Sequence, residues 1–353
     1  MKVAFDVSPV KTGHQVRGIG VYTQGLVTEF KKGEWPDIKF EFFQKPASPP
    51  PADVIHYPYF DLFFKTLPQK KHSGRVVITI HDVIPMVFPK HFPVGLKGHI
   101  NLFLQKMALK NADAVICDSQ TSKNDIVNKL SYPKEKIHVI YLAPSESFRK
   151  IPENELPIII KKYKLPQKFI LYVGDVNWNK NIPNLLQAVK ITKVNLVMVG
   201  AAITNPYLPE TTAIDNLITE LDIKNQVTKT GFVKEADLIA IYNAASLTIQ
   251  SSFYEGFGLP VLESMACGTP VVCSNVASLA EIAGPAIFCD PTNPSDIADK
   301  INHVLSLSNK EKDIISQKSI EHAAKFSWHK VAKHTIDVYQ KVYKIPGHLP
   351  GGL

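Results

Sequence analysis

The sequence predicts an α/β protein of two similar halves, each built on a parallel β-sheet covered by helices. Short runs of β-branched and aromatic residues alternate with longer segments of helical periodicity, a pattern typical of parallel sheets. The 353 residues are too many for one ordinary core and favour about two domains. Between residues 143 and 168, prolines alternate with charged residues, as expected of a linker between the halves.

The first half contains six candidate strands and several helical patterns. Apolar residues recur at helical spacing in Ile19–Phe30 and Leu96–Leu109, and Ser119 and Ser122 stand as candidate N-caps before Asp125–Leu130. The candidate strands are Val3–Val7, Lys39–Phe43, Val54–Tyr57, Val76–His81, Ala114–Cys117 and Ile137–Tyr141.

A second series of strands, each followed by a turn and a helical pattern, comes after the linker. These strands are Phe169–Val173, Leu196–Val199, Val227–Thr230, Leu247–Ile249, Val271–Ser274 and Ala286–Cys289. Ligands of parallel sheets bind at the carboxyl ends of the strands, so we expect functional residues directly after each strand.

Composition and charge exclude some classes of protein. Apolar residues make up 45% and charged residues 20%, values of a folded globular chain rather than a disordered one. The formal charge of +8 favours an anionic partner, which can be nucleic acid, a phosphorylated small molecule or an acidic membrane face. The four cysteines lack metal-binding spacing and are expected to be reduced, buried thiols of a cytoplasmic protein. No signal peptide is expected, and no apolar run approaches the ~18 residues of a spanning helix.

The most informative segment is Ser251–Glu263, which follows the apolar strand Leu247–Ile249. Gly256 and Gly258 form the turn into a helix, with Pro260 at its first position. The exposed N–H groups and positive dipole of such a helix end suit a phosphate. Glu255 lies before this turn and Glu263 after it, and both carboxylates suit sugar hydroxyls. A phosphate site with a sugar-binding acid on each side indicates a nucleotide sugar as the ligand. The alternative is a tight strand–helix turn with two solvated glutamates.

This segment resembles the E-x7-E motif of the retaining GT-B glycosyltransferases of family 4. The whole chain is similar to the mannosyltransferase-like branch of that family, which builds surface polysaccharides and glycolipids. The resemblance covers nearly the full length. It is carried by Gly18–Thr23 (a glycine loop), Ile80–Pro85, Ala112–Ile116 with Ser119, Tyr172–Gly174 with Asn179–Asn181, and Phe326–Trp328 followed by Val331–Tyr343.

The resemblance implies a GT-B fold, in which two Rossmann-like domains face a cleft that holds the active site. We expect an acceptor domain at residues 1–160 and a nucleotide-sugar donor domain at 161–325. A helix at 326–345 is expected to cross back and pack on the first domain.

The resemblance also implies roles for single residues. Glu255 would contact hydroxyls of the donor sugar, and Glu263 the hydroxyls of the ribose. The amides of Gly258 and Leu259, with Lys180, would hold the diphosphate. Gly174 would lie in the phosphate-binding turn, and the backbone of Gly20 would contact the phosphates. The main chain of Val233 would contact the base, and His81 would contact the donor sugar or the leaving phosphate.

One departure from the family concerns the diphosphate. Many relatives have Arg after the glycine of the phosphate turn, where this chain has Asp175, and a basic residue where it has Asn179. The positive charge would then rest on Lys180 and the helix end, with Arg17 as a further candidate.

The expected chemistry is transfer of a hexose with retention of configuration. Charge grows on the departing diphosphate in the transition state, so Lys180 and the helix N-terminus are the expected catalytic groups. No Asp-x-Asp is present and no metal or cofactor is expected. The motif offers no base beyond the diphosphate, which favours attack by the acceptor on the face that the diphosphate leaves.

Three features of the first half each have two interpretations. His81 can be a buried structural histidine or a donor contact. The aromatic cluster from His56 to Phe64 can be core or an acceptor or membrane contact. The lysines near residues 70–110 can be a solvated face or a contact with an anionic membrane.

Three rival functions are weaker. For a nicotinamide oxidoreductase, the chain lacks the third glycine of the fingerprint. For a nucleic-acid binder, it lacks a recognisable motif. A two-carboxylate hydrolase would need Glu255 and Glu263 to face the same glycosidic bond. We therefore expect a cytoplasmic enzyme that uses a nucleotide-sugar donor, with GDP-mannose as the expected one, and a saccharide or lipid-linked acceptor. We also expect peripheral contact with the inner membrane face and no nucleic acid. The alternatives are a UDP-hexose donor or a nucleotide- or nucleic-acid-binding protein without transferase activity.

Overall fold

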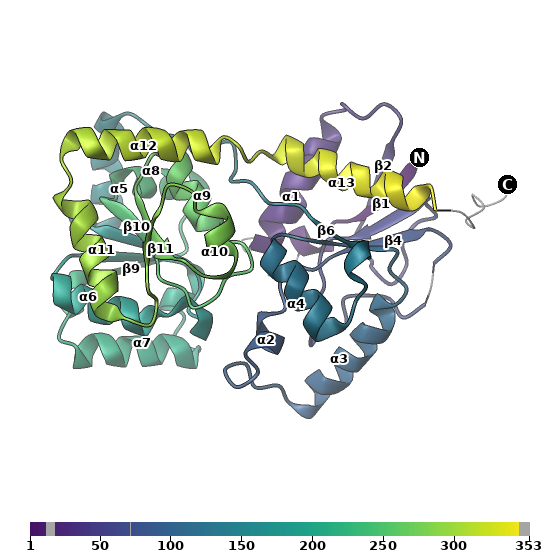
Figure 1. The fold of residues 1–353 in the computed structure, drawn as a ribbon, viewed down its shortest axis with the longest axis horizontal. Coiled ribbons are helices and arrows are strands. Elements are labelled where there is room, and N and C mark those ends of the chain that lie inside the picture. The colour runs from purple at the N-terminus through teal and green to yellow at the C-terminus, as the bar shows by residue number, and fades with distance from the viewer. Residues whose placement is uncertain (12–17, 71, 346–353) are drawn as a thin grey trace. The chain divides into compact units, whose positions relative to one another are not determined.

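The computed structural model describes residues 1–11, 18–70 and 72–345, which form two compact units (Figure 1). The N-terminal unit contains Met1–Leu142 and the segment from Ser327 onward, and the second unit contains Ala143–Phe326. The division falls earlier than the boundary expected at residue 160. The reason is that Phe148 and Ile159, from the proline-containing linker, are buried in the hydrophobic core of the second unit.

The N-terminal unit is built on a sheet of six parallel strands in the order β2-β1-β3-β4-β5-β6. The strands are β1 (Lys2–Asp6), β2 (Lys39–Phe43), β3 (Val54–Tyr57), β4 (Arg75–Thr79), β5 (Ala114–Cys117) and β6 (Ile137–Val139). Every residue of β3 and β5 is buried, which agrees with helices on both faces. The sequence of β5 is wholly apolar, whereas β3 also buries His56.

The helices of this unit cover both faces of its sheet (Figure 1). They are α1 (Gly18–Lys31), α2 (Ile84–Val87), α3 (Leu96–Leu109), α4 (Gln120–Leu130) and α13 (Trp328–Tyr343), with short 3-10 helices η1 (Ser8–Lys11) and η2 (Lys134–Lys136). Side chains of α3 and α4 pack into one core, and α13 packs beside α1 over β3, β4 and β5. A Cβ on Gly25 of α1 would lie 2.5 Å from the Trp328 ring, so glycine permits the close contact between these two helices.

A buried chain of hydrogen bonds ties α13 to this sheet. Tyr339 Oη of α13 lies 2.6 Å from His56 Nδ1, and His56 Nε2 lies 2.8 Å from Thr79 Oγ1. Tyr22 Oη of α1 lies 2.9 Å from the same threonine hydroxyl. Burial lowers the pKa of His56 to about 3, because the charged imidazolium would lose its hydration. His56 is therefore a neutral structural residue.

The second unit is built on another sheet of six parallel strands, in the order β12-β11-β10-β7-β8-β9. The strands are β7 (Ile170–Val173), β8 (Leu196–Val199), β9 (Val227–Gly231), β10 (Leu247–Gln250), β11 (Val271–Ser274) and β12 (Ile287–Cys289). The strands β8, β10 and β11 are buried along their whole length.

Helices also cover both faces of the second sheet. They are α5 (Leu156–Tyr163), α6 (Ile182–Thr192), α7 (Pro209–Glu220), α8 (Glu235–Ala244), α9 (Leu259–Ala266), α10 (Ala277–Ile282), α11 (Pro294–Ser306) and α12 (Asn309–Ala323), with 3-10 helices η3 (Glu153–Glu155), η4 (Trp178–Lys180), η5 (Ala201–Thr204) and η6 (Lys224–Gln226). Side chains of α6, α7 and α11 fill one core, and side chains of α5 and α8 fill the other, with α9 beside α8 (Figure 1).

Three local expectations can be compared with these elements. Ser119 is the N-cap of α4, and its Oγ accepts a hydrogen bond from Ser122 N at 3.0 Å, so Ser119 is confirmed and Ser122 lies inside the helix. The glycine loop expected at Gly18–Thr23 is wrong, because these residues form the first turns of α1. Arg17 lies outside the described residues.

The aromatic cluster of the first half is mostly core. His56, Tyr57 and Phe60 are buried, and among the cluster only Phe64 has a highly exposed side chain. Within residues 1–11, 18–70 and 72–345, no helix has the length and apolar composition needed to span a bilayer.

Candidate active site

The turn from β10 into α9 has the geometry of an anion-binding helix end. Gly258 is the N-cap of α9, with φ of +107° and ψ of 43°. The positive φ favours glycine, and a Cβ at this position would lie 2.6 Å from Leu279 Cδ2, so a side chain here would also displace that methyl group. Leu259 and Pro260 then form the first positions of the helix, and both are partly exposed. The positive end of the helix dipole therefore reaches the surface at the residues predicted to hold phosphate.

Two elements outside the motif hold this turn in place. Ser278 Oγ of α10 lies 2.9 Å from the Glu255 carbonyl oxygen and 2.8 Å from that of Phe257. On the other side, Asn179 Nδ2 donates to the Tyr254 carbonyl at 2.9 Å, and Phe253 N donates to the Asn179 carbonyl at 2.8 Å. The turn is thus joined by hydrogen bonds to the segment after β7 and to α10.

Glu255 and Lys180 form a nearly buried ion pair beside the turn. Lys180 Nζ lies 2.8 Å from each carboxylate oxygen of Glu255. The side chain of Lys180 is 18% exposed, and that of Glu255 is 7% exposed. Oε1 of Glu255 also accepts hydrogen bonds from Gln250 Nε2 at 2.8 Å and Ser252 Oγ at 2.7 Å. The carboxylate is therefore held by donors from β10, the turn and η4.

Lys180 is positioned by the residues around η4. Asn181, directly after it, has a φ of +55°, and its side-chain amide donates to the carbonyls of Ser251 at 2.8 Å and Pro291 at 2.6 Å. The ring of Trp178 stacks on that of Phe253, with centroids 5.1 Å apart. This packing brings Lys180 to Glu255, although the two are far apart in the sequence.

The turn after β7, which is predicted to bind phosphate, contains Gly174 and Asp175. A Cβ on Gly200, which follows β8, would lie 2.0 Å from the Gly174 carbonyl oxygen, so the two strand ends approach closely. Asp175 Oδ1 accepts a hydrogen bond from Val176 N at 2.8 Å, and the Asp175 carbonyl accepts one from Tyr172 Oη at 2.6 Å. The carboxylate that replaces the expected arginine is thus bonded to the backbone of its own turn.

Glu263 lies within α9, beyond its first turn, and is partly buried. Tyr242 Oη donates a hydrogen bond to its Oε2 at 2.8 Å. Burial raises the pKa of Glu263 to about 7. The negative charge of Glu235 also raises this pKa, whereas the hydrogen bond from Tyr242 lowers it. Glu263 therefore exists in both protonation states near neutral pH.

Val233 follows Gly231, at the carboxyl end of β9. Its side chain is buried in a core with Ile239 and Tyr242, which leaves its main chain as the part that can meet a ligand. Gly231 has a φ of +72°, and a Cβ there would lie 2.8 Å from Thr204 Oγ1.

The N-terminal unit has its own strand-end cluster, centred on His81 after β4. His81 Nδ1 lies 2.6 Å from Asp118 Oδ2, and Asp118 follows the neighbouring strand β5. The ring of Tyr22 packs edge-on against His81, with centroids 4.8 Å apart. Burial opposes the charged imidazolium, but the Asp118 carboxylate outweighs it, so the pKa of His81 is raised. Among the described residues His81 Nε2 has no hydrogen-bond partner.

The structure thus brings Lys180 to Glu255, in the turn that continues into Gly258 and Leu259 at the start of α9. Gly174, Val233 and Glu263 lie at or near the carboxyl ends of the same sheet. His81 and Gly20 belong to the N-terminal unit, where Gly20 is buried in the first turn of α1.

Several site residues were missed in the sequence. Asp118, Gln250, Ser252 and Ser278 contact predicted residues or support the turn. Asp118 directly follows a predicted strand, which was an available signal, whereas nothing in the sequence connects Ser278 with the turn. No group of three metal-ligating side chains is arranged around an ion position in the described parts of the chain.

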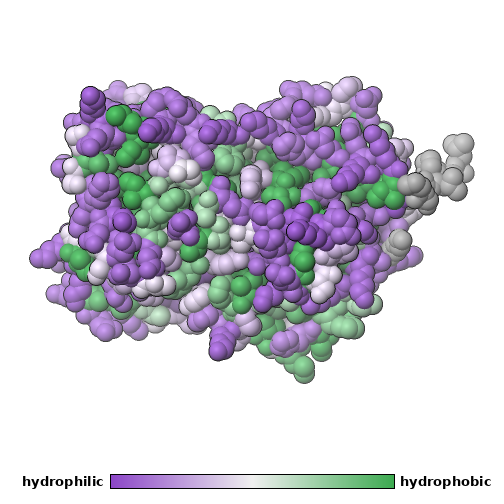
Figure 2. All heavy atoms as spheres, viewed as in Figure 1, coloured by the Kyte–Doolittle hydropathy of each residue, from purple (hydrophilic) through white to green (hydrophobic). Residues whose placement is uncertain are grey.

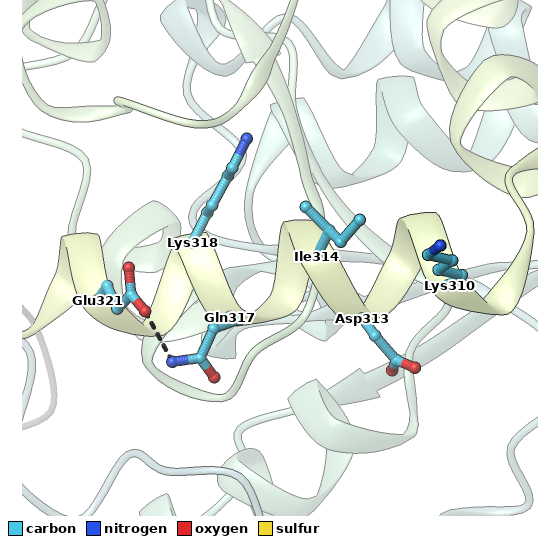
Figure 3. A pocket seen from close by; sticks show the side chains of 6 residues that line it. All are labelled: Lys310, Asp313, Ile314, Gln317, Lys318 and Glu321. Carbon is cyan, nitrogen blue, oxygen red and sulfur yellow. Dashed lines mark hydrogen bonds between the residues drawn. The ribbon is translucent and has the colours of Figure 1, made fainter.

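A hollow on α12 is separate from these residues. It is lined by six side chains of that single helix, which Figure 3 shows along its exposed face: Lys310, Asp313, Ile314, Gln317, Lys318 and Glu321. Gln317 Nε2 donates to Glu321 Oε1 at 2.8 Å across it. The lining contains none of the candidate site residues, so we assign it no role in the site.

Comparison with known proteins gives the family. The family pattern described as "Glycosyl transferases group 1" matches residues 157–320, and that described as "Glycosyltransferase Family 4" matches residues 36–143. The O-antigen chain mannosyltransferase B of Escherichia coli is 32% identical over 270 residues, which cover 75% of this chain and 70% of that protein. The serotype-specific mannosyltransferase WbdA of E. coli is 28% identical over 305 residues, 83% of this chain but 36% of that longer protein.

Among solved structures, Anabaena Alr3699/HepE in complex with UDP and glucose has a TM-score of 0.75 with this chain at 18% identity, and the match covers 96% of this chain and 99% of that one. This likeness extends to both parallel sheets and their helices and shows the same fold. The two family patterns and the similarity to the E. coli mannosyltransferase cover both units. This chain therefore belongs to the family 4 glycosyltransferases and has the GT-B fold.

Proposed function

We propose that this glycosyltransferase moves a mannosyl unit from GDP-mannose to a saccharide or lipid-linked acceptor, with retention of configuration, in the assembly of a surface polysaccharide. Two of the relatives described above are named as mannosyltransferases, one of an O-antigen chain, which supports the sugar and the pathway class. The observation that carries the proposal is the Lys180–Glu255 pair beside the glycine-capped end of α9.

Lys180 is the proposed partner of the departing diphosphate. An ammonium group has three N–H donors, and the two bonds to Glu255 use two of them. The third can be directed to a phosphate oxygen without breaking the ion pair. Together with the end of α9 and the amides of Gly258 and Leu259, it would stabilise the negative charge that grows as the bond to the sugar breaks.

Glu255 is the proposed contact for hydroxyls of the donor sugar. Its Oε1 already accepts three hydrogen bonds, whereas the described bonds to Oε2 come from Lys180 alone. We therefore propose that a sugar hydroxyl donates to Oε2. The same carboxylate fixes the Lys180 ammonium, so Glu255 also positions the group that stabilises the leaving diphosphate.

The other predicted residues have binding roles in this proposal. Glu263 accepts from the ribose hydroxyls, the main chain of Val233 contacts the base, and Gly174 lets the backbone approach the phosphates. In the N-terminal unit, Gly20 contributes backbone to the phosphates. For His81 we keep the role that the resemblance implies, a hydrogen bond to an oxygen of the donor, which suits its raised pKa.

The proposed reaction needs neither a protein nucleophile nor a metal ion. The bond between the sugar C1 and the phosphate oxygen breaks, and its electron pair stays on the diphosphate. The acceptor oxygen bonds to C1 on the face that the diphosphate leaves, and its proton passes to a phosphate oxygen. The positive charge that a metal would supply comes from Lys180 and the helix end, so turnover should persist in EDTA.

A UDP-hexose is the second candidate donor. It is favoured by the fold shared with Alr3699/HepE, which was solved with UDP and glucose. Main-chain contacts such as that proposed for Val233 select weakly between bases. The choice between the two donors is therefore an experimental one.

Two measurements test the proposal. A thermal-shift series with GDP, UDP and ADP and their hexose conjugates should show the largest stabilisation with GDP and GDP-mannose, and a preference for the UDP compounds would replace the donor. Turnover of Lys180→Met should fall by about 100-fold or more, the loss typical for a group that stabilises transition-state charge. Lys190→Met, at an exposed position of α6, is the matched control. Unchanged turnover in Lys180→Met would refute the role of Lys180.

A further inference from the structure

The exposed face of α3 in the N-terminal unit is apolar. Leu96, Ile100, Phe103 and Met107 are 79%, 54%, 64% and 45% exposed, respectively. A surface helix of a globular protein normally directs polar side chains outward. In α3 the polar Asn101 and Gln105 are instead buried, so the usual distribution is largely inverted.

The buried polar residues of α3 have structural partners, so the helix is firmly placed. Gln105 Nε2 donates to the Asp61 carbonyl at 3.0 Å and to Thr66 Oγ1 at 2.7 Å. Asn101 Nδ2 donates to the Phe63 carbonyl at 2.8 Å. These bonds fasten α3 to the segment that carries Phe64, whose side chain is 69% exposed. The polar face of α3 is therefore held inward by specific hydrogen bonds, and the outward direction of the apolar row is a fixed feature of the fold.

All charged residues of α3, and Lys110 directly after it, are lysines. At about 100° per residue, the four apolar side chains fall within an arc of roughly 60°. Lys97 lies on one side of that arc, and Lys106 and Lys110 lie on the other. From residue 83 to residue 112 the chain contains four lysines and neither Asp nor Glu. In Figure 2, apolar residues gather at the lower edge of the N-terminal unit, where Figure 1 places α3.

A hollow adjoins the row at the C-terminal end of α3. It has a volume of about 460 Å³, and its walls include Phe103, Met107 and Tyr132, with Lys106, Lys110 and Lys136 around them. Apolar walls with lysines around them are complementary to an anionic lipid, in which a negatively charged headgroup is joined to apolar chains. Lysines thus surround the hollow, as they surround the apolar row.

We propose that α3 and Phe64 form a docking face for an anionic lipid bilayer. The row Leu96, Ile100, Phe103 and Met107 would enter the boundary between headgroups and acyl chains, and the flanking lysines would contact lipid phosphates. A helix with an apolar face, a cationic border and no acid is the composition of an interfacial helix. The charge complementarity favours a bilayer over a second copy of the chain, whose docking face would carry the same positive charge.

The test is co-sedimentation of the full chain with vesicles of phosphatidylcholine alone or mixed with phosphatidylglycerol. The protein should bind the anionic vesicles, and Ile100→Gln/Phe103→Gln should bind about tenfold less. Lys97→Gln/Lys110→Gln should show a similar loss, and raised salt should weaken binding of the unchanged protein. The matched controls are Ile158→Gln/Ile314→Gln and Lys190→Gln/Lys318→Gln on the second unit, which should bind as the unchanged protein does.

The outcome is independent of the proposed transfer reaction. All of the substituted side chains are on the surface, so thermal unfolding and the thermal shift with nucleotide should be the same in every variant. Equal binding to both kinds of vesicle, or equal losses in the controls, would overturn the proposal. A dimer in light scattering that Ile100→Gln/Phe103→Gln dissociates, without any effect on vesicle binding, would also overturn it and identify the face as an interface between copies.

Discussion

Glu263 should make the protein less stable as the pH rises. Its pKa is raised from 4.5 to about 7 by burial, whereas in the unfolded chain it returns to the ordinary value. Between these two values the unfolded state loses a proton that the folded state keeps, so stability falls with pH across this window. The pKa difference corresponds to roughly 3 kcal/mol at pH 8 and to less than about 1 kcal/mol at pH 5.

The substitution Glu263→Gln removes this penalty while keeping an oxygen that can accept the Tyr242 hydrogen bond. Urea unfolding at pH 5 and pH 8 should show the variant close to the unchanged protein at pH 5 and more stable by up to about 3 kcal/mol at pH 8. Glu220→Gln, at an exposed position of α7, is the control and should have no such pH dependence.

The same variant should bind nucleotide more weakly at pH 8, because an amide replaces the carboxylate proposed to accept from the ribose. More stable protein with weaker binding would show that the buried carboxylate is kept for its ligand. A variant as stable as the unchanged protein at both pH values, or less stable at pH 8, would refute the reasoning.

Three further predictions concern other positions. Gly258→Ala should cost at least about 1 kcal/mol, because alanine is strained at a φ of +107°, and adding Leu279→Ala should cost less than the sum of the single losses in a double-mutant cycle. Tyr339→Phe removes a buried hydroxyl bonded to an imidazole of β3 and should lower the free energy of unfolding by about 1–3 kcal/mol in urea. Asp118→Asn should lower the pKa of His81 in an NMR titration, and an unmoved titration would exclude Asp118 as the cause.

Much of the fold could be predicted from the order of residue types. Parallel strands buried on both faces require continuous apolar sequences, and the helices between them require a period near four, so both signals are local. The strand Ala114–Cys117 and the helix Leu96–Leu109 were predicted with the bounds that the structure has. The boundary near residue 160 was misplaced because prolines mark irregular backbone and carry no information on which core will bury Phe148 and Ile159.

The site was predictable where it is a local motif. Gly258, Pro260 and the two glutamates lie within one strand–turn–helix segment, so their spacing describes the geometry of the turn. The contacts of that turn were not predictable. Lys180 reaches Glu255, and Ser278 supports the backbone of the turn, through packing between segments that are distant in the chain.

The sequence by itself determined the α/β class, the two sheets, the glycine-capped helix end and the family, because each can be read from short local runs of residues along the chain. Only the tertiary structure decided the charge state and partners of the side chains. Burial raises the pKa of Glu263 and lowers that of His56, and both effects depend on atoms from other strands and helices. It also decided that α3 presents its apolar row outward, because periodicity alone defines an apolar face but not the surface against which that face packs.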